Sequence, residues 1–491
     1  MGSRADAGHS KGAMTESKAK QWLDAAVRAM RDSVRFVGEK AQSSHVRLGV
    51  TGLTGAGKTV FTTALAHALI HARHAPAELA FLDVANRGNV VGVAIEDLPG
   101  LAPFPVERNL ALLTAEKPEW PAPTKALSGV RIVLRFAPQG LMRHASPEAE
   151  LKVDIVDYPG EWLVDLPLLD QDFPAWSRAT WARLADTGNE QARALSGAWC
   201  KAADAVPSLD GLDARALSYG RLMRELKGDR FGWAWLTPGR GLTWSEAEWI
   251  ASGAAFFPLP PEGLVPSPAF GSLVARYQRY VEALVKPFYR KHLRNLDRQI
   301  VLVDLLGALA RGPDSFHGMR EALARILEHF RYGGWRLLQP LLGRRIGRAM
   351  VAAAKADLVT ASQLAALRSL LRETVDWSVM KKLKDYQHAT EDRTDYFIGC
   401  LASIVSTEER IARFGEAEVP VLQGRVLGAA QEQILVPSDV PPALPAPARW
   451  PPRGYKYYPF EPPDLAAFRE RAFPHLGLDK ALQFLIGDKV A

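Results

Sequence analysis

Cysteine is nearly absent from this sequence: only Cys200 and Cys400 occur among 491 residues. Two cysteines cannot build the disulfide framework of a small secreted protein, so a reducing, cytoplasmic location is expected. Long apolar runs are also missing, since none approaches the ~18–20 residues of a membrane-spanning helix. The first residues lack the apolar segment of a secretory signal, and the histidines show no metal-ligand spacing. Neither a secreted, an integral membrane nor a zinc protein is therefore expected.

The residues that are present describe an ordinary globular protein. Apolar residues make up 47% of the chain and charged residues 23%, the composition of a folded protein with a sizeable core. The length accommodates two or three domains, or one domain with large insertions. The formal net charge of +7 is modest for this length and indicates a basic, solvated surface, so no nucleic acid partner is expected.

The stretch GLTGAGKT, residues 52–59, matches the GxxxxGK[ST] pattern of a phosphate-binding loop. It lies between an apolar strand expected at 46–51 and a segment with helical periodicity, the order that such a loop requires. The glycines allow tight turns, and the following amides point at the β-phosphate from a helix N-terminus. Lys58 can reach the β- and γ-phosphate oxygens, and the Thr59 hydroxyl can ligate Mg²⁺. The residues expected to bind the nucleotide here are Gly52, Gly55, Ala56, Gly57, Lys58, Thr59 and Val60.

A P-loop also needs an acidic residue on a neighbouring strand to fix Mg²⁺, and VDIVDYPGEW supplies one. Asp157 ends an apolar strand expected at 150–157 and is followed by Gly160, which makes the DxxG pattern of GTPases. In that pattern the aspartate holds Mg²⁺ through water and the glycine amide contacts the γ-phosphate. Asp154 lies on the opposite face of the strand, so Asp157 is preferred as the metal-binding carboxylate.

The strand that carries DxxG is expected to form a hairpin with a β-branched stretch at 129–136. In GTPases the threonine that senses the γ-phosphate lies just before that partner strand. Thr124 in EWPAPTKALS has this position and is predicted to contact Mg²⁺ and the γ-phosphate. Thr114 and Ser128 are less well placed, and an ordinary loop threonine is the alternative.

The base would be selected at the end of a later strand, expected at 348–354. The stretch AKAD, residues 354–357, matches the [NT]KxD pattern at its lysine and its aspartate. The Asp357 carboxylate would accept two hydrogen bonds from guanine N1 and N2, a donor pair that adenine lacks. The Lys355 stem would lie over the base plane. Ala354 departs from the pattern, because the usual Asn or Thr ties this loop to the phosphate-binding loop.

Strand and helix patterns alternate along most of the chain. Further buried strands are expected at 299–306 and 395–405, and the second ends near Ala402, whose amide is a candidate donor to guanine O6. This alternation predicts an α/β fold of the P-loop NTPase type, with a mostly parallel sheet and helices on both faces. Residues 162–297 show long helical patterns and no convincing strand, which predicts a large helical insertion.

The domain organisation expected from these patterns has five parts. They are a leader with an amphipathic helix (1–44), the first part of the GTPase domain (45–162), the helical insertion (163–297), the second part of the GTPase domain (298–415) and a proline-rich extension with a closing helix (416–491). The helix at 15–40 either docks on the protein or binds a membrane surface. The basic stretch at 330–348 is interpreted as a surface helix, with contact to an anionic membrane or partner as the alternative.

Together these segments resemble the YcjX-like family of bacterial P-loop GTPases. The resemblance covers about residues 21–490 and is carried by VTGLTGAGKT, WPAPTKALSGVRIVLRF, VDIVDYPGEWLVDLPLL, DRQIVLVDLL, AAAKAD and FPHLGLDKALQFLIGDK. It implies a GTPase core interrupted by a helical insertion, a stress-linked cytoplasmic role and a frequent functional link to a small membrane protein. Such a link would bring the chain to the periphery of the inner membrane.

One residue departs from the Ras-like pattern where the attacking water is oriented. Glu161 stands directly after the DxxG glycine, where Ras-like enzymes have glutamine. A carboxylate can orient water or act as a base, yet it would lie near the anionic γ-phosphate; a helix N-terminal carboxylate is the alternative. Slow intrinsic hydrolysis is therefore expected unless a partner reorganises the site. Arg87 and Arg108 are interpreted as surface residues, so no arginine finger is assigned.

The sequence thus predicts a GTP-binding protein that slowly hydrolyses GTP to GDP and phosphate with Mg²⁺ and acts as a nucleotide-state switch. The predicted catalytic residues are Lys58, Thr124, Gly160 and Glu161, and the predicted metal-binding residues are Thr59, Thr124 and Asp157. Two alternatives stay open. One is an ATP-dependent P-loop enzyme in which AKAD is accidental, and the other is a nucleotide-binding scaffold without turnover.

Overall fold

The computed structural model describes residues 43–490, apart from 75, 125, 140–146, 186, 188, 203–207, 229, 331–345, 376–394 and 447–448. The helix expected at 15–40 and most of the basic stretch at 330–348 lie outside the described residues. Within the part of the chain that is described, no helix is long and apolar enough to cross a membrane.

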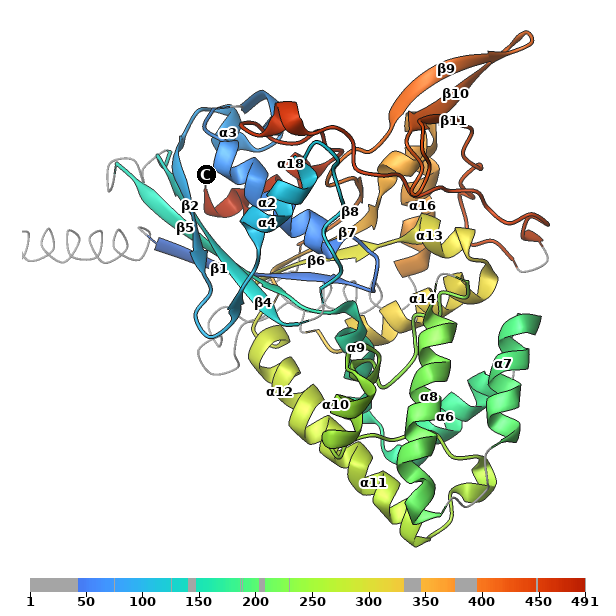
Figure 1. Ribbon diagram of the computed structural model, residues 1–491. Coiled ribbons are helices and arrows are strands. Elements are labelled where there is room, and N and C mark those ends of the chain that lie inside the picture. Colours follow the sequence, from blue (N-terminus) through green and yellow to red (C-terminus); the bar gives the residue numbers. More distant parts are fainter. Residues whose placement is uncertain are drawn as a thin grey trace, which may run out of the picture.

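A mostly parallel sheet forms the centre of the fold (Figure 1), and eight strands of it lie in the described residues. The strand order is β2-β4-β5-β1-β6-β7-β8, and the short β3 pairs with β4. The strands are β1 (Ser43–Gly52), β2 (Val90–Asp97), β3 (Ala102–Pro103), β4 (Ser128–Phe136), β5 (Ala149–Asp157), β6 (Arg298–Val303), β7 (Arg348–Ala354) and β8 (Asp395–Leu401). Only β4 runs antiparallel to its long neighbours, β2 and β5. The predicted fold class is confirmed.

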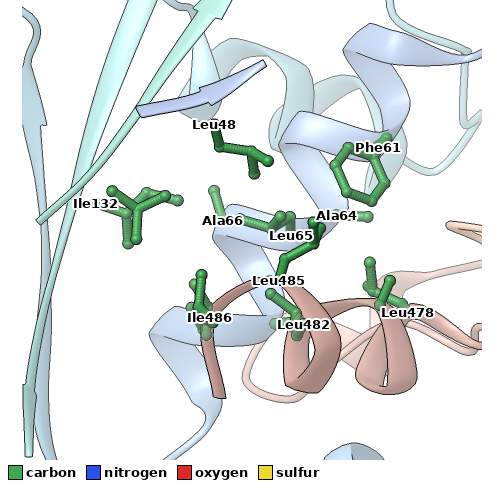
Figure 2. Close-up of a cluster of buried hydrophobic side chains, with 14 of the residues drawn as sticks. Leu48, Phe61, Ala64, Leu65, Ala66, Ile132, Leu478, Leu482, Leu485 and Ile486 are labelled. Carbon is green, nitrogen blue, oxygen red and sulfur yellow. The ribbon is translucent and has the colours of Figure 1, made fainter. Parts of the chain in front are cut away.

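One face of the sheet is covered by helices from both ends of the domain. They are α2 (Lys58–His71), α4 (Val106–Leu113) and the closing helix α18 (Leu478–Ile486). Figure 2 shows Leu482 and Leu485 of α18 in the same buried cluster as Phe61 and Leu65 of α2, beside Leu48 of β1. The i, i+3 and i, i+4 spacing of these residues places them on one face of each helix. The predicted closing helix is therefore part of the core.

The other face is covered by α13 (Leu305–Ala310), α14 (Pro313–Leu327) and α16 (Leu364–Val375), whose leucines share a second core with β6 and β7. The strand expected at 299–306 ends earlier than predicted, at Val303, because the Asp304 side chain caps α13 by accepting the Gly307 amide at 2.9 Å. The strand expected at 395–405 also ends early, at Leu401. Short helical turns complete the domain: η1 (Pro76–Leu79), α3 (Asp83–Asn86), η8 (Ala356–Leu358), η9 (Ala361–Gln363), η11 (Ala466–Phe468) and η12 (Gly487–Lys489).

A second, three-stranded sheet was not predicted. It consists of β9 (Glu408–Phe414), β10 (Ala417–Gly424) and β11 (Gln433–Leu435), and it extends away from the central sheet in Figure 1. Strands β9 and β10 form an antiparallel hairpin around Gly415. The expected boundary between 415 and 416 falls inside this hairpin, at its turn.

The residues between β5 and β6 form the predicted helical insertion, and the described ones contain no strand. Its elements are η2 (Gly160–Asp170), α6 (Phe173–Ala185), α7 (Glu190–Lys201), η3 (Leu209–Gly211), α8 (Leu212–Lys227), α9 (Arg240–Thr243), α10 (Glu246–Ala251), η4 (Pro261–Gly263), α11 (Pro268–Tyr280), η5 (Val281–Val285), α12 (Lys286–Phe288) and η6 (Tyr289–Leu293). Aromatic residues such as Trp176, Trp249 and Phe256 give it a core of its own. Figure 1 shows these helices grouped beyond one end of the sheet. The first of these elements, η2, begins at Gly160, so the insertion starts at the DxxG glycine, slightly before the expected boundary at 163.

Candidate functional site

The phosphate-binding loop connects the end of β1 to the start of α2. Gly55 and Gly57 have φ values of 80° and 86°, a left-handed conformation that glycine adopts without strain. Gly52 lies so close to β6 that a Cβ there would be 2.7 Å from the Leu302 carbonyl oxygen. The buried Lys58 ammonium donates to the Gly52 carbonyl at 3.0 Å. The strand, loop and helix thus have the order and backbone geometry that a phosphate-binding loop requires.

Thr59, Thr124 and Asp157, the three residues predicted to bind Mg²⁺, lie together. The hydroxyl oxygens of Thr59 and Thr124 are 2.9 Å apart, and the Thr124 hydroxyl donates to Asp157 Oδ2. The register of the β4–β5 hairpin explains this proximity, because Ser128 pairs with Asp157 and the loop before β4 therefore ends beside the carboxyl end of β5. By contrast, the Thr114 hydroxyl bonds the Leu110 carbonyl at the end of α4.

This group fits a Mg²⁺ ion. Asp157 is buried, and its Oδ1 atom has no hydrogen-bond partner among the described residues. The described residues contain no cluster of three His, Cys, Asp or Glu. The donors present are one carboxylate and two hydroxyls, so phosphate oxygens and water would have to complete the shell.

At the phosphate end of the site, burial and neighbouring charges have opposite effects on the pKa values of Lys58 and Asp157. Burial lowers the pKa of Lys58, and attraction to Asp157 and Glu161 works against that shift. Burial raises the pKa of Asp157, although the Thr124 hydroxyl and the Lys58 ammonium favour its ionised form. A divalent cation next to Asp157 and phosphates next to Lys58 would favour the charged form of each group.

Gly160 and Glu161 begin the insertion and lie against the phosphate-binding loop. A Cβ on Gly160 would be 2.6 Å from the Thr54 amide nitrogen, so only glycine fits against the loop. Glu161 forms an ion pair with Lys227 at the end of α8. Burial alone would raise the pKa of Glu161, but the Lys227 ammonium and the Thr54 hydroxyl outweigh burial and lower it. Glu161 also stands in the first turn of η2, the position that the helix N-terminal alternative expects, and its part in orienting water stays a prediction.

The residues predicted to read the base follow β7. Asp357 Oδ2 accepts hydrogen bonds from the amide of Ser406 at 2.8 Å and from its hydroxyl at 2.5 Å. Lys355 has a φ of 59°, uncommon for a residue other than glycine and typical of functional loops. Its ammonium bonds Asp304 at 2.8 Å. Ser406 and Asp304 were not predicted, because each is brought here by a loop after a different strand.

The expected role of the Ala402 amide needs a correction. Ala402 borders the cavity described below, but its amide donates to the Leu476 carbonyl at 3.0 Å in a bridge to the C-terminal segment. It therefore has no free N–H for guanine O6. Ser403 and Ile404 also border the cavity and follow directly in the chain.

A single cavity of about 530 Å³ is bordered both by the phosphate-binding loop and by the residues predicted to read the base. Its lining includes Thr54 to Val60, Trp120 to Thr124, Gly160, Glu161, Lys355, Asp357, Ala402, Ser406, Leu427, Pro459 and Phe460. The Trp120 indole donates to the Phe460 carbonyl at 2.8 Å, which joins the loop before β4 to the proline-rich extension. The part of this extension in the wall of the cavity was not predicted. Arg87 and Arg108 are exposed, and neither borders the cavity.

Comparisons with known proteins show the family of this chain. The family model described as "YcjX-like family, DUF463" matches residues 46–490. The chain is 32% identical over 483 residues to a protein of Escherichia coli named "Ras-like GTPase YcjX", covering 94% of this chain and 100% of that protein. It is 34% identical over 500 residues to a protein of the same name from Shewanella oneidensis, covering 95% of this chain and 99% of that protein. The chain therefore belongs to the YcjX-like family.

Proposed function

We propose that this chain binds GTP and GDP together with Mg²⁺ and hydrolyses GTP to GDP and phosphate. The observation that carries the proposal is one cavity bordered both by the phosphate-binding loop and by Asp357 with Ser406. A phosphate cradle at one end and a carboxylate at the other match the two ends of a guanine nucleotide. The relatives named "Ras-like GTPase YcjX" support the same activity.

Each group has a part in the proposed reaction. Backbone amides between Gly55 and Val60 and the Lys58 ammonium bind the phosphates. Thr59, Thr124 and Asp157 hold Mg²⁺, which supplies positive charge to the phosphate oxygens when bound. The Gly160 amide approaches the γ-phosphate, and the Glu161 carboxylate orients the attacking water or accepts its proton.

The proposed switch depends on two segments that border the γ-phosphate end of the cavity. Thr124 belongs to the loop before β4, and Gly160 begins η2 and the insertion. GTPases change shape when such segments lose their contacts with the γ-phosphate and Mg²⁺. Loss of phosphate is therefore expected to act on both the loop at Thr124 and the insertion.

A nucleotide-binding panel with and without Mg²⁺ tests the proposal. GDP and GTP should compete for one site, whereas ATP should displace neither at comparable concentration. Asp357→Asn should shift the preference from guanine to xanthine nucleotides, because the amide replaces one acceptor by a donor. Equal displacement by ATP would instead support the alternative of an ATP-dependent enzyme.

Turnover distinguishes an enzyme from a binding scaffold. Phosphate release from GTP should require Mg²⁺ and should be abolished in Lys58→Ala, because the cation on the β- and γ-phosphates is lost. Lys286 of α12, which is partly exposed and pairs with Glu282, offers a control, since Lys286→Ala removes a lysine far along the chain from the loop. Tight GTP binding by the wild-type chain without any phosphate release would identify a scaffold.

A further inference from the structure

Lys227 is a residue of the insertion that reaches the nucleotide site. It ends α8, and its ammonium pairs with Glu161, the residue after the DxxG glycine. The two side chains are 24% and 12% exposed, so the pair is largely shielded from water. Both residues border a second cavity of about 370 Å³, which shares Thr54, Gly55, Ala56 and Gly160 with the nucleotide cavity. Lys227 therefore lies on the side of the phosphate-binding loop that faces the insertion.

The insertion also fixes the backbone that carries Glu161. A Cβ on Gly239 would overlap the Glu161 carbonyl oxygen, so the two backbones are in direct contact. Further along η2, the buried Asp165 accepts the Gly239 amide at 2.6 Å and the Tyr280 hydroxyl at 2.5 Å. The backbone of Glu161 is thus fixed by its neighbours in the insertion, and the ion pair with Lys227 holds its carboxylate.

Charge balance explains why this carboxylate needs a cation. The charges of Asp157, Glu161 and Lys227 all act on the Lys58 ammonium beside the phosphate-binding loop. Two lysines and two carboxylates cancel, which leaves the site neutral before nucleotide and metal enter. Without Lys227 the unpaired Glu161 would add a negative charge next to the position of the γ-phosphate. GDP lacks that phosphate and would be affected far less.

Resting on the proposed binding of GTP, we propose that Lys227 is the residue that allows this site to accept a triphosphate beside Glu161. The lysine neutralises and positions the Glu161 carboxylate. The helical insertion thus supplies, from the same chain, a positive charge that none of the nucleotide-binding motifs provides for Glu161. The insertion thereby determines the preference of the site for GTP over GDP.

The test compares the affinities of four chains for GDP and for the slowly hydrolysed analogue GTPγS, both with Mg²⁺. They are the wild type, Lys227→Met, Glu161→Gln and the double variant. Lys227→Met keeps the apolar stem and should lose at least tenfold in affinity for GTPγS while its affinity for GDP changes less than twofold. The double variant should regain the lost GTPγS affinity, because it has no unpaired carboxylate, although hydrolysis of GTP stays low without Glu161. Lys227→Arg should keep the wild-type ratio.

The outcomes separate this inference from the proposed function. A Lys227→Met chain that loses GDP and GTPγS equally, with no recovery in the double variant, would show that the lysine only holds the fold. An unchanged ratio of the two affinities would also overturn the inference. Lys286→Met, which removes a partly exposed lysine of α12 that also pairs with a glutamate, serves as the matched control and should leave the ratio unchanged. Failure of the wild-type chain to bind either nucleotide would refute the proposed function itself.

Discussion

Ser406→Ala offers a sharp test of base recognition. Asp357 would need an ionised carboxylate to accept hydrogen bonds from guanine, yet burial raises its pKa. The amide and hydroxyl of Ser406 oppose that shift by donating to Oδ2. The Ser406 hydroxyl is therefore expected to keep Asp357 ready for guanine, and alanine removes it while the amide stays.

The size of the effect follows from the kind of hydrogen bond that is lost. A hydrogen bond to a charged group contributes about 1.5–3 kcal/mol. At about 1.4 kcal/mol for each factor of ten, this sets an upper limit of about 150-fold on the loss of GDP affinity in Ser406→Ala, because the bond is already made without nucleotide. The sign of the pH dependence is also fixed. Because the variant raises the pKa of Asp357 further, its GDP affinity should be lost at a higher pH than that of the wild type as the pH falls.

Equilibrium titration with fluorescent GDP from pH 5 to pH 8 measures both effects. Ser403→Ala is a suitable control, because Ser403 borders the same cavity without donating to Asp357. The reasoning is refuted if Ser406→Ala binds GDP as tightly as Ser403→Ala does, with the same pH profile. That result would mean that the Asp357 carboxylate needs no support from Ser406 or does not contact the base.

Three other changes test the metal site and the contacts of the insertion. Asp157→Asn should reduce GTPγS affinity in Mg²⁺ to the level that the wild type shows in EDTA, as measured by the same titration. Gly239→Ala places a Cβ on the Glu161 carbonyl oxygen and should lower the free energy of unfolding, measured with denaturant, by about 1–3 kcal/mol. Gly271→Ala is the control, because a Cβ at Gly271 meets nothing within 4 Å. Burial raises the pKa of Asp165 to about 6, so its contribution to stability is complete below the unfolded value near 4 and is lost as the pH rises through 6. Relative to Asp165→Asn, the wild type should therefore lose up to about 3 kcal/mol of unfolding free energy between pH 4 and pH 7.5.

The phosphate end of the site could be predicted because its determinants are local. Strand, glycine loop and helix follow one another within residues 43–71, and the conformation of such a loop depends on glycines at fixed positions. Asp157 and Gly160 could be placed by the same reasoning at the end of a strand. Thr124 needed one step more, since its position follows from the register of a hairpin rather than from a motif.

The proline-rich extension shows where such reasoning stops. Its composition predicts an extended segment over the domain. This describes the conformation of the segment but not which part of the domain the segment contacts. Trp120 and Phe460 meet across a separation of 340 residues, and no periodicity in either segment indicates that they border the same cavity. The same holds for Ser406, which reaches Asp357 only because β7 and β8 are neighbours in the sheet.

Lys227 illustrates the limit most clearly. If GTP binds as proposed, its γ-phosphate repels the Glu161 carboxylate, so a cation is expected near Glu161. The chain contains 61 lysines and arginines, and helical periodicity can say only which of them face water. Lys227 stands in the last turn of α8, where a cation also favours the helix C-terminus and needs no functional explanation. Its role depends on how the rest of the insertion packs against η2, and that packing is set by buried contacts such as the one between Asp165 and Gly239, which join parts of the chain that the sequence pattern treats as independent.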